Sequence, residues 1–206
     1  AVRQGPIYAG RKSDGSYGHQ DTFSPEAWLD SNSFKKGTNK YFQGAGELSW
    51  QPVKGLTVSG KAGYMLFSYY DKNYISNITF SPTSSLGPNK LSVYSGQGTQ
   101  VTLQALATYT KTFDKHNFTV LAGATQEEYN DHYLTGYRQN FPNELIYELN
   151  AGSGTGMSNT GTSSSWAMRS VFGRLNYIFD SKYLFEANIR RDGTSKFPSA
   201  GRWGVL

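Results

Sequence analysis

The connections between the strand-like segments of this 206-residue chain are alternately very short and very long. The short ones are residues 51–55, 114–117 and 180–182, and the long ones run roughly from Asp71 to Gly96 and from Asn130 to Ser165. A sheet connected in this way has two chemically different ends. Transmembrane β-barrels of outer membranes show this pattern, with tight turns at the periplasmic end and long loops at the external end. The chain is therefore predicted to be all-β, an antiparallel transmembrane β-barrel segment that forms part of a larger barrel.

Apolar and polar residues alternate with a period of two, which is the repeat of a β-strand. The pattern predicts six full strands and the start of a seventh at Arg202. The six span about Tyr41–Trp50, Leu56–Tyr70, Gln97–Phe113, Phe118–Tyr129, Ala167–Phe179 and Tyr183–Asp192. A membrane-spanning strand needs only about 9–11 residues, so the absence of an 18-residue apolar run excludes a transmembrane helix but not a barrel.

The two faces of these strands differ in polarity. We expect one face to meet lipid, and its representatives are Val58, Val101, Leu103, Ala105, Val120, Leu175 and Phe185. We expect the other face to line a wet lumen, and its polar members are Glu47, Lys61, Gln104, Glu127, Arg174, Glu186 and Arg190. The apolar faces are rich in Gly and Ala, which would fill a sandwich core poorly, whereas fluid acyl chains adapt to such a surface.

Aromatic residues flank the short turns. A ring of amphipathic side chains at one level is typical of the girdle at a membrane interface. The predicted girdle comprises Trp50, Phe113, Phe118, Phe179 and Tyr183.

The first forty residues do not alternate like a strand and are placed in an external loop. Within them, Phe23–Leu29 predicts a short helix capped by Ser24, with Pro25 at its first position and Phe23 able to pack on Trp28. The Gly/Ser/Thr-rich stretch 152–165 is expected to be a mobile loop tip. Loop aromatics are candidates for substrate or partner contact, with packing against neighbouring loops as the alternative for each: Trp28, Tyr74, Tyr94, Tyr137 and Tyr147.

The sequence shows no pattern typical of a catalytic, metal-binding or nucleic-acid-binding site. The chain has no Cys, and His19, His116 and His132 are far apart, with surface exposure in a turn expected for His116. The formal charge is +5, but the cations are scattered rather than gathered in a stripe, so no nucleic-acid partner is expected. We predict neither an enzyme nor a cofactor. Residues 1–4 show no signal-peptide pattern, and both ends read as cut from something longer.

Several stretches together resemble the mid-barrel region of the SusC/RagA-type TonB-dependent transporters. The most specific is the run Arg-Arg-Asp-Gly-Thr-Ser-Lys-Phe at residues 190–197. The other similar stretches are Ser170–Tyr177, Lys182–Leu184, Ala187–Ile189, Arg202–Gly204, Leu48–Leu56, His116–Gly123, Phe141–Asn143 and Leu149–Gly152. The resemblance covers about residues 41–205.

The resemblance implies a 22-stranded barrel with an N-terminal plug, located in the bacterial outer membrane. It also implies import of oligosaccharides or peptides, energised through TonB, beside a SusD-like surface lipoprotein. Residues 1–206 would then belong to one barrel domain, with 1–40 as an external loop and 41–206 as strands and loops. The plug and the TonB-contacting segment would lie outside this chain. The alternatives are a soluble β-sandwich, such as a carbohydrate-binding module, and a secreted adhesin domain.

Overall fold

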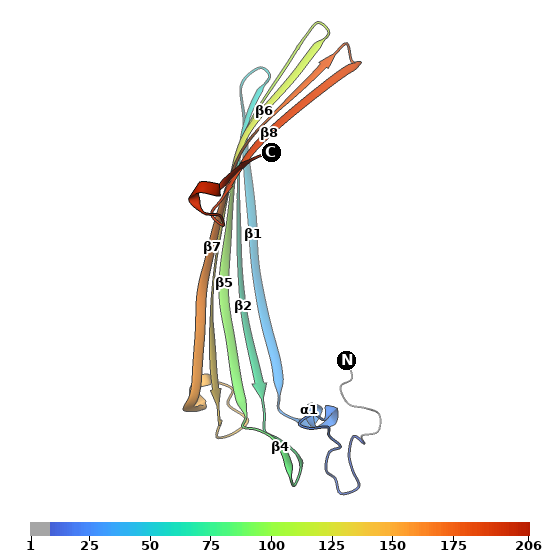
Figure 1. Ribbon diagram of the computed structural model, residues 1–206, viewed down its shortest axis with the longest axis vertical. Helices are drawn as coiled ribbons and strands as arrows, with labels where there is room; N and C mark the ends of the chain where they lie inside the picture. The colour runs from blue at the N-terminus through green and yellow to red at the C-terminus, as the bar shows by residue number, and fades with distance from the viewer. Residues whose placement is uncertain (1–8) are drawn as a thin grey trace. The chain divides into compact units, whose positions relative to one another are not determined.

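The alternating segments form one seven-stranded sheet in the computed structural model, which describes residues 9–206 (Figure 1). The strands lie in the order β1-β2-β5-β6-β7-β8-β9. Their bounds are Phe34–Val53 for β1, Leu56–Ile75 for β2, Lys90–Phe113 for β5, His116–Gln139 for β6, Ser153–Phe179 for β7, Tyr183–Thr194 for β8 and Trp203–Val205 for β9. The predicted six strands, and a seventh starting near Arg202, are confirmed. Residues 1–4, for which the sequence shows no signal-peptide pattern, lie outside the described residues.

Each strand of this sheet pairs with the sheet's next strand along the chain, and β2 pairs with β5 because β3 and β4 form a sheet of their own. β7 and β8 are antiparallel from Met168 opposite Thr194 to Phe179 opposite Tyr183, and β8 pairs with β9 in the same sense. The short strands β3 (Ile78–Ser81) and β4 (Ser84–Leu86) form a separate two-stranded sheet. A sandwich needs two sheets of comparable extent packed face to face. The described residues contain no second sheet of that size, so the sandwich alternative is not supported.

The strands are longer than predicted, so much of what was expected to be loop is strand. β1 begins at Phe34, β5 begins at Lys90, and β6 continues to Gln139. The Gly/Ser/Thr-rich stretch expected to be a mobile tip belongs to β7, from Ser153 onward. Composition misled here because strand β6 supplies the ladder hydrogen bonds of β7 through the backbone, whatever the side chains are.

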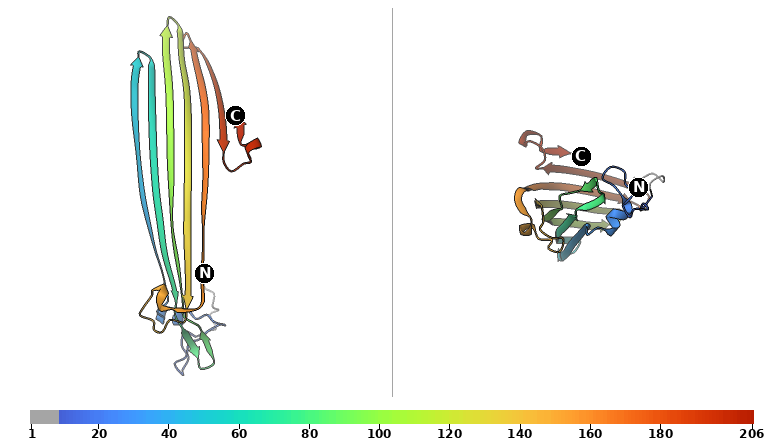
Figure 2. Two further views of the ribbon diagram at one scale, coloured as in Figure 1. Left: turned by 90° about the vertical axis from the view of Figure 1, so that its left-hand side faces the viewer. Right: turned by 90° about the horizontal axis from the view of Figure 1, so that it is seen from below.

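Residue contacts divide the chain into two units. The first, called the loop unit, comprises Ala1–Asn39, of which 9–39 are described, with Tyr69–Gly96 and Tyr133–Thr162. The second, called the strand unit, comprises Lys40–Ser68, Gln97–His132 and Ser163–Leu206. Figure 2 shows the strands of the strand unit side by side in one sheet.

The three tight turns of the seven-stranded sheet belong to the strand unit, whereas the short turn between β3 and β4 belongs to the loop unit. They connect β1 to β2 at Lys54-Gly55, β5 to β6 at Asp114-Lys115, and β7 to β8 at residues 180–182. Gly55 has φ of 85°, and a Cβ there would lie 2.4 Å from the Thr110 carbonyl oxygen, so only glycine fits this turn. Asp114 has a φ of 48°, which an Asp side chain tolerates better than most.

The loop unit contains the predicted helix as α1, Pro25–Asp30. The Ser24 hydroxyl accepts a hydrogen bond from the Ala27 amide, which confirms the predicted cap. Leu149–Ala151 and Ser199–Gly201 form short 3-10 turns, the second in the strand unit. Among the described residues, no helix is long and apolar enough to span a membrane.

Candidate functional site

The predicted lumen-facing residues of the strand unit contact one another across strands. Lys61 Nζ lies 3.1 Å from Glu47 Oε2, which joins β1 to β2. The amide of Gln100 on β5 donates to the Glu127 carboxylate on β6. Gln104 shares the alternation of Gln100 and therefore lies on the same side of β5.

The same polar face continues on β7 and β8. Arg174 Nε donates to Asn188 Oδ1 at 2.9 Å, and the Asn188 amide donates to Glu186 Oε1 at 2.8 Å. Arg190 pairs with Asp192 at 2.7 Å. These pairings place Arg174, Glu186 and Arg190 on one side of the sheet because strand neighbours that bond through side chains must share a face.

Side chains that pack over Gly123 show which faces of β5, β6 and β7 lie on the same side of the sheet. A Cβ added to Gly123 on β6 would lie 2.5 Å from the Phe172 ring on β7 and 2.7 Å from Leu106 on β5. Leu106, Gly123 and Phe172 therefore lie on the face that also carries Gln104, Glu127 and Arg174. The structure thus assembles the seven predicted polar residues on one continuous face.

The opposite face of the strand unit is apolar and open. Val58, Leu103, Val120 and Phe185 are 38%, 46%, 44% and 57% exposed. Ala105 is also exposed, while Val101 and Leu175 are partly covered by their neighbours. In a water-soluble domain such a surface would be an aggregation liability, since soluble monomers rarely expose more than a few hundred Å² of contiguous apolar surface.

Aromatic rings gather beside the tight turns, four of them from the predicted girdle. Phe113 stacks on Phe118 with 5.8 Å between ring centroids, and Phe179 lies 6.4 Å from Tyr183. His116, which the sequence placed as a plain exposed turn residue, is half-buried between these rings, and its Nδ1 lies 2.8 Å from the Tyr177 hydroxyl. Trp50 is 68% exposed.

A row of rings on the polar face was not foreseen. Phe67 stacks on Tyr129, Tyr129 stacks on Trp166 at 5.7 Å, and Lys196 Nζ lies 5.0 Å from the centre of the Trp166 ring. Phe67 also covers Gly98, where a Cβ would lie 2.2 Å from the ring. The signal was present in the sequence, because the alternation assigns Trp166 to this face when read backward from Phe172, and Tyr129 when read forward from Glu127.

The loop aromatics named as contact candidates differ in accessibility. Tyr74 is fully buried and packs edge-on against Phe141 and Tyr147, so its ring has no free face for a ligand. Trp28 packs against the cluster of Ala27, Ile78 and Phe80.

The other candidates keep part of their surface. Tyr94 stacks on Tyr69 at 5.1 Å, and the hydroxyl of Tyr137 donates to Gln139. Tyr94, Tyr137 and Tyr147 are half-buried. Packing against neighbouring loop residues therefore describes Tyr74 and Trp28, and in part Tyr147, whose ring contacts Phe34 and Tyr74. Tyr94, Tyr137 and the exposed part of Tyr147 remain candidates.

Polar residues that the sequence did not single out hold the loop unit together. The side chain of Asn89 donates to the Phe141 carbonyl oxygen at 3.1 Å and accepts from the Phe141 amide at 2.7 Å. Glu144 accepts hydrogen bonds from the Asn32 side chain and the Asn77 amide. No alternation or motif marks such long-range bonds, which depend on how the loops meet.

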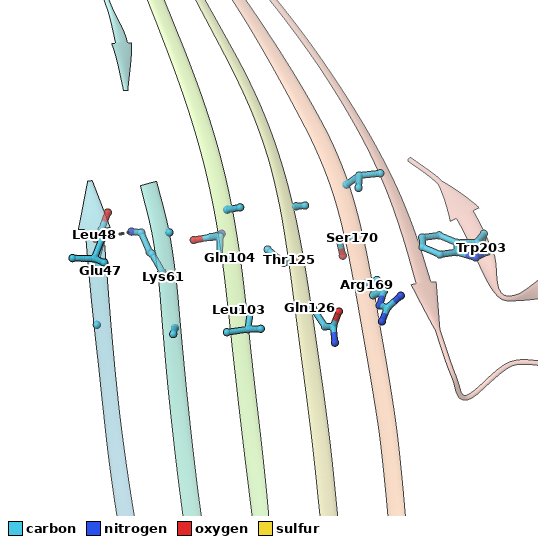
Figure 3. A pocket seen from close by; sticks show the side chains of 16 residues that line it. Glu47, Leu48, Lys61, Leu103, Gln104, Thr125, Gln126, Arg169, Ser170 and Trp203 are labelled. Carbon is cyan, nitrogen blue, oxygen red and sulfur yellow. Dashed lines mark ion pairs between the residues drawn. The ribbon is translucent and has the colours of Figure 1, made fainter. Parts of the chain in front are cut away.

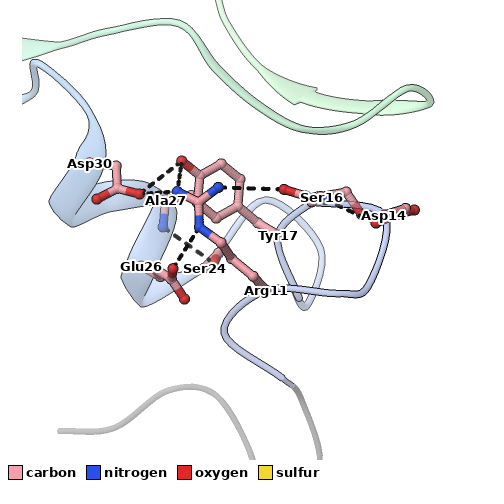
Figure 4. A network of polar contacts seen from close by, with 9 residues as sticks. Arg11, Asp14, Ser16, Tyr17, Ser24, Glu26, Ala27 and Asp30 are labelled. Atoms are coloured by element: carbon pink, nitrogen blue, oxygen red, sulfur yellow. Dashed lines mark hydrogen bonds and ion pairs between the residues drawn. The ribbon is translucent and has the colours of Figure 1, made fainter.

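An exposed ionic cluster surrounds α1 (Figure 4). Arg11 pairs with Glu26 at 2.8 Å and with Asp30 at 2.5 Å, and Tyr17 also donates to Asp30. The hydrogen bonds to Glu26 and then to Asp30 raise the pKa of Arg11. The cluster ties the segment before the helix to the helix itself. Within the described part of the chain, no group of acidic, His or Cys side chains has the arrangement of a metal site.

Comparisons with known proteins agree with this geometry. The chain is 34% identical over 100 residues to TonB-dependent receptor P3 and 40% identical over 106 residues to TonB-dependent receptor P39, both of Formosa agariphila. These matches cover 48% and 47% of the chain but 10% and 9% of the relatives, so the chain spans only a small part of their length. No family model matches the chain.

Solved structures share the fold. The RagAB peptide transporter matches with a TM-score of 0.80 at 21% identity, over 87% of this chain and 20% of that one. The RagAB peptide importer in its 'closed-closed' state matches with a TM-score of 0.82 at 21% identity, over 92% of this chain and 21% of that one. The sequence relatives and the shared fold both support the resemblance of this chain to a strand segment of the SusC/RagA-type TonB-dependent transporters.

Proposed function

We propose that this chain forms part of the wall of an active importer in the bacterial outer membrane, which takes up oligosaccharides or peptides. The observation that carries the proposal is the two-sided strand unit. One face presents exposed Leu103, Val120 and Phe185, and the other carries ion pairs such as Glu47–Lys61. A sheet with these faces is stable where hydrocarbon covers one side and water the other.

The turn asymmetry supports an orientation. Tight turns of outer-membrane barrels are periplasmic and long connections are external. The three tight turns and the aromatic rings at Phe113, Phe118 and Phe179 then mark the periplasmic interface. The residues of the loop unit provide the external connections, where substrate and partner proteins arrive.

The polar face suits the inner wall of a wide barrel. A wide barrel leaves an aqueous lumen that needs a plug, and polar side chains allow hydrated solutes to pass. Arg174, Glu186 and Arg190 are satisfied within the wall by Asn188 and Asp192, so the wall is charged without strong unpaired charge. Energisation through TonB is part of the proposal, and the sequence relatives, which are TonB-dependent receptors, support it.

A SusD-like lipoprotein is the proposed partner of the loop unit. The loop unit exposes large apolar side chains, with Leu29 at 85% and Leu145 at 82%. Leu134, Ile146 and Met157 of the same unit are also exposed, and apolar exposure of this extent favours contact with another protein. Tyr94, Tyr137 and Tyr147 remain the proposed positions for substrate contact.

Uptake by the full-length parent protein tests the proposal. Cells that express it would be offered fluorescently labelled peptides and oligosaccharides, with and without a protonophore that abolishes TonB energisation. We expect accumulation of one substrate class, loss of accumulation with the protonophore, and recovery of the protein in the outer-membrane fraction. Recovery in the soluble fraction, or uptake that ignores the protonophore, would contradict it.

The partner is tested separately by affinity purification of the parent protein with the lipoprotein encoded beside it. Leu29→Asp with Leu145→Asp should reduce recovery of the lipoprotein. The control Leu48→Asp, in the strand unit, should impair assembly of the barrel instead. Undiminished recovery with the loop variants would refute the proposed interface.

A further inference from the structure

The apolar face of the strand unit ends abruptly at two arginines. On β7, every second residue from Val171 to Phe179 lies on the apolar face and is uncharged. Two residues before Val171, the same face carries Arg169. On β8, Ile189 is followed on that face by Arg191. The stretch from Val171 to Phe179 is about as long as one membrane crossing, which takes about 9–11 residues. Charged side chains on a lipid-facing surface are tolerated near an interface, so the arginines mark the far edge of the apolar band.

The two arginines are close neighbours. In the β7–β8 pairing, Arg169 lies opposite Gly193 and Arg191 lies opposite Val171. The two arginines are therefore diagonal neighbours on one face, a relation in which backbone positions are about 7–8 Å apart. Trp203 on β9 lies opposite Gly193, and the Arg191 guanidinium carbon sits 5.2 Å from the centre of its ring. Among the described residues, neither arginine forms a hydrogen bond or an ion pair through its side chain. One anionic group can therefore reach both guanidinium groups.

A hollow in the apolar face adjoins this pair. It has a volume of about 900 Å³, and its lining is mainly apolar. The lining includes the small residues Gly46, Gly60, Ala62, Ala105 and Ala124, and also the intervening polar residues Glu47, Lys61, Gln104, Thr125 and Ser170. Leu48, Leu103 and Val171 also line it. Arg169 and Trp203 line it from β7 and β9, on the side away from Leu48 on β1 (Figure 3). Ligand pockets commonly measure about 300–1,000 Å³, so the hollow is large enough for part of an acyl chain.

We propose that this surface binds one anionic lipid, with its phosphorylated headgroup between Arg169 and Arg191 and an acyl chain in the hollow. The mainly apolar lining of the hollow suits a hydrocarbon tail, and the neighbouring Arg169 and Arg191 suit an anionic headgroup. Trp203 provides the amphipathic ring that favours the headgroup level. The inference rests on the proposed membrane location, and the tight turns at the other edge of the band place the site in the external leaflet.

One acidic residue shares this face by alternation and limits the charge. Glu128 on β6 accepts a hydrogen bond from Gln126, which itself lines the hollow. The two arginines still leave the rim with a positive balance. Removing the Glu128 charge should therefore leave lipid binding unchanged or strengthen it, which distinguishes a charge effect from general damage to the face.

The test measures lipids that stay bound to the full-length parent protein. The purified protein would be reconstituted with phosphatidylglycerol or with phosphatidylcholine of the same chains, and bound lipid counted by native mass spectrometry. We expect preferential retention of phosphatidylglycerol. Each of Arg169→Gln and Arg191→Gln should weaken that retention by about fivefold, the value of one basic residue near an anionic surface. Ala105→Phe, which fills the hollow, should reduce retention without changing charge.

Matched controls make the outcome decisive. Arg174→Gln removes the same charge from the polar face and should leave retention unchanged, and Arg191→Lys should preserve most of it. Equal losses for Arg174→Gln and Arg169→Gln, or no preference for the anionic lipid, would overturn the lipid site. Competition by inorganic phosphate alone would assign the arginines to free anions instead. A parent protein that fails to enter any bilayer would overturn the proposed function itself, which is a distinct result.

Discussion

The loop unit buries large hydrophobic side chains, whereas the strand unit exposes side chains of the same kinds. Every buried hydrophobic residue among those described lies in the loop unit, including Tyr74, Phe80 and Leu91 at 1% exposure or less. The strand unit leaves Leu48 84% and Leu184 75% exposed. The loop unit thus builds a small core as a water-soluble domain does, whereas the strand unit displays its apolar side chains outward. The difference is what the proposed membrane location requires, in which water surrounds the loop unit and hydrocarbon covers one face of the strand unit.

The first prediction concerns the core of the loop unit. Phe80→Ala removes a ring packed with Ala27 and Ile78, and should destabilise this unit by about 3–5 kcal/mol, as large-to-small core changes do. Hydrogen exchange on the full-length protein in detergent should show lost protection near β3 and α1, with strand-unit protection retained. Leu145→Ala, at an exposed site, is the control. Equal loss in both units would mean that the two do not fold separately.

The second prediction concerns the apolar face. Ala105→Arg places a charge on the apolar face and should impair assembly of the full-length protein, by up to the about 2–4 kcal/mol that such a charge costs at the bilayer midplane. Leu106→Arg, one residue away on the polar face, should cost less because its charge meets water. The measurement is the folded fraction after dilution into detergent micelles or bilayers. Similar folded fractions for the two variants would show that the assigned faces are wrong.

The smallest expected effect is on the polar face. Glu47→Gln breaks the ion pair with Lys61, but both side chains are nearly half exposed, at 47% and 45%. Pairs of this kind contribute about 0–1 kcal/mol because water and salt screen them. Urea titration of the folded protein in bilayers should place the variant within that range. A much larger loss would indicate that the polar face is covered by protein rather than by water.

Alternation alone was enough to locate the strands and their faces. The polar set from Glu47 to Arg190 lies on one side because a period of two is a local property of the strand backbone. The same rule places Arg169 beside Val171 and Arg191 beside Ile189, although the band edge was overlooked. Strand ends were missed where side chains are small and polar, as in β7 from Ser153, because ladder pairing there is independent of hydrophobicity.

The loop unit was much less predictable. Asn89 and Phe141 are 52 residues apart in the chain, yet two hydrogen bonds join them. Tyr74 and Tyr94 look equivalent as loop aromatics in the sequence, but Tyr74 is buried while Tyr94 remains partly open. Burial of a ring depends on which loops meet above it, and no short-range pattern encodes that meeting.

The residue order by itself determined a two-faced antiparallel sheet with tight turns, since period, turn chemistry and aromatic placement act over a few residues. The tertiary structure decided which aromatics are core, which polar residues pair across strands, and that Arg169 and Arg191 are diagonal neighbours on β7 and β8. Those features arise between segments far apart in the chain, where shape and solvent, rather than local preference, select the contacts.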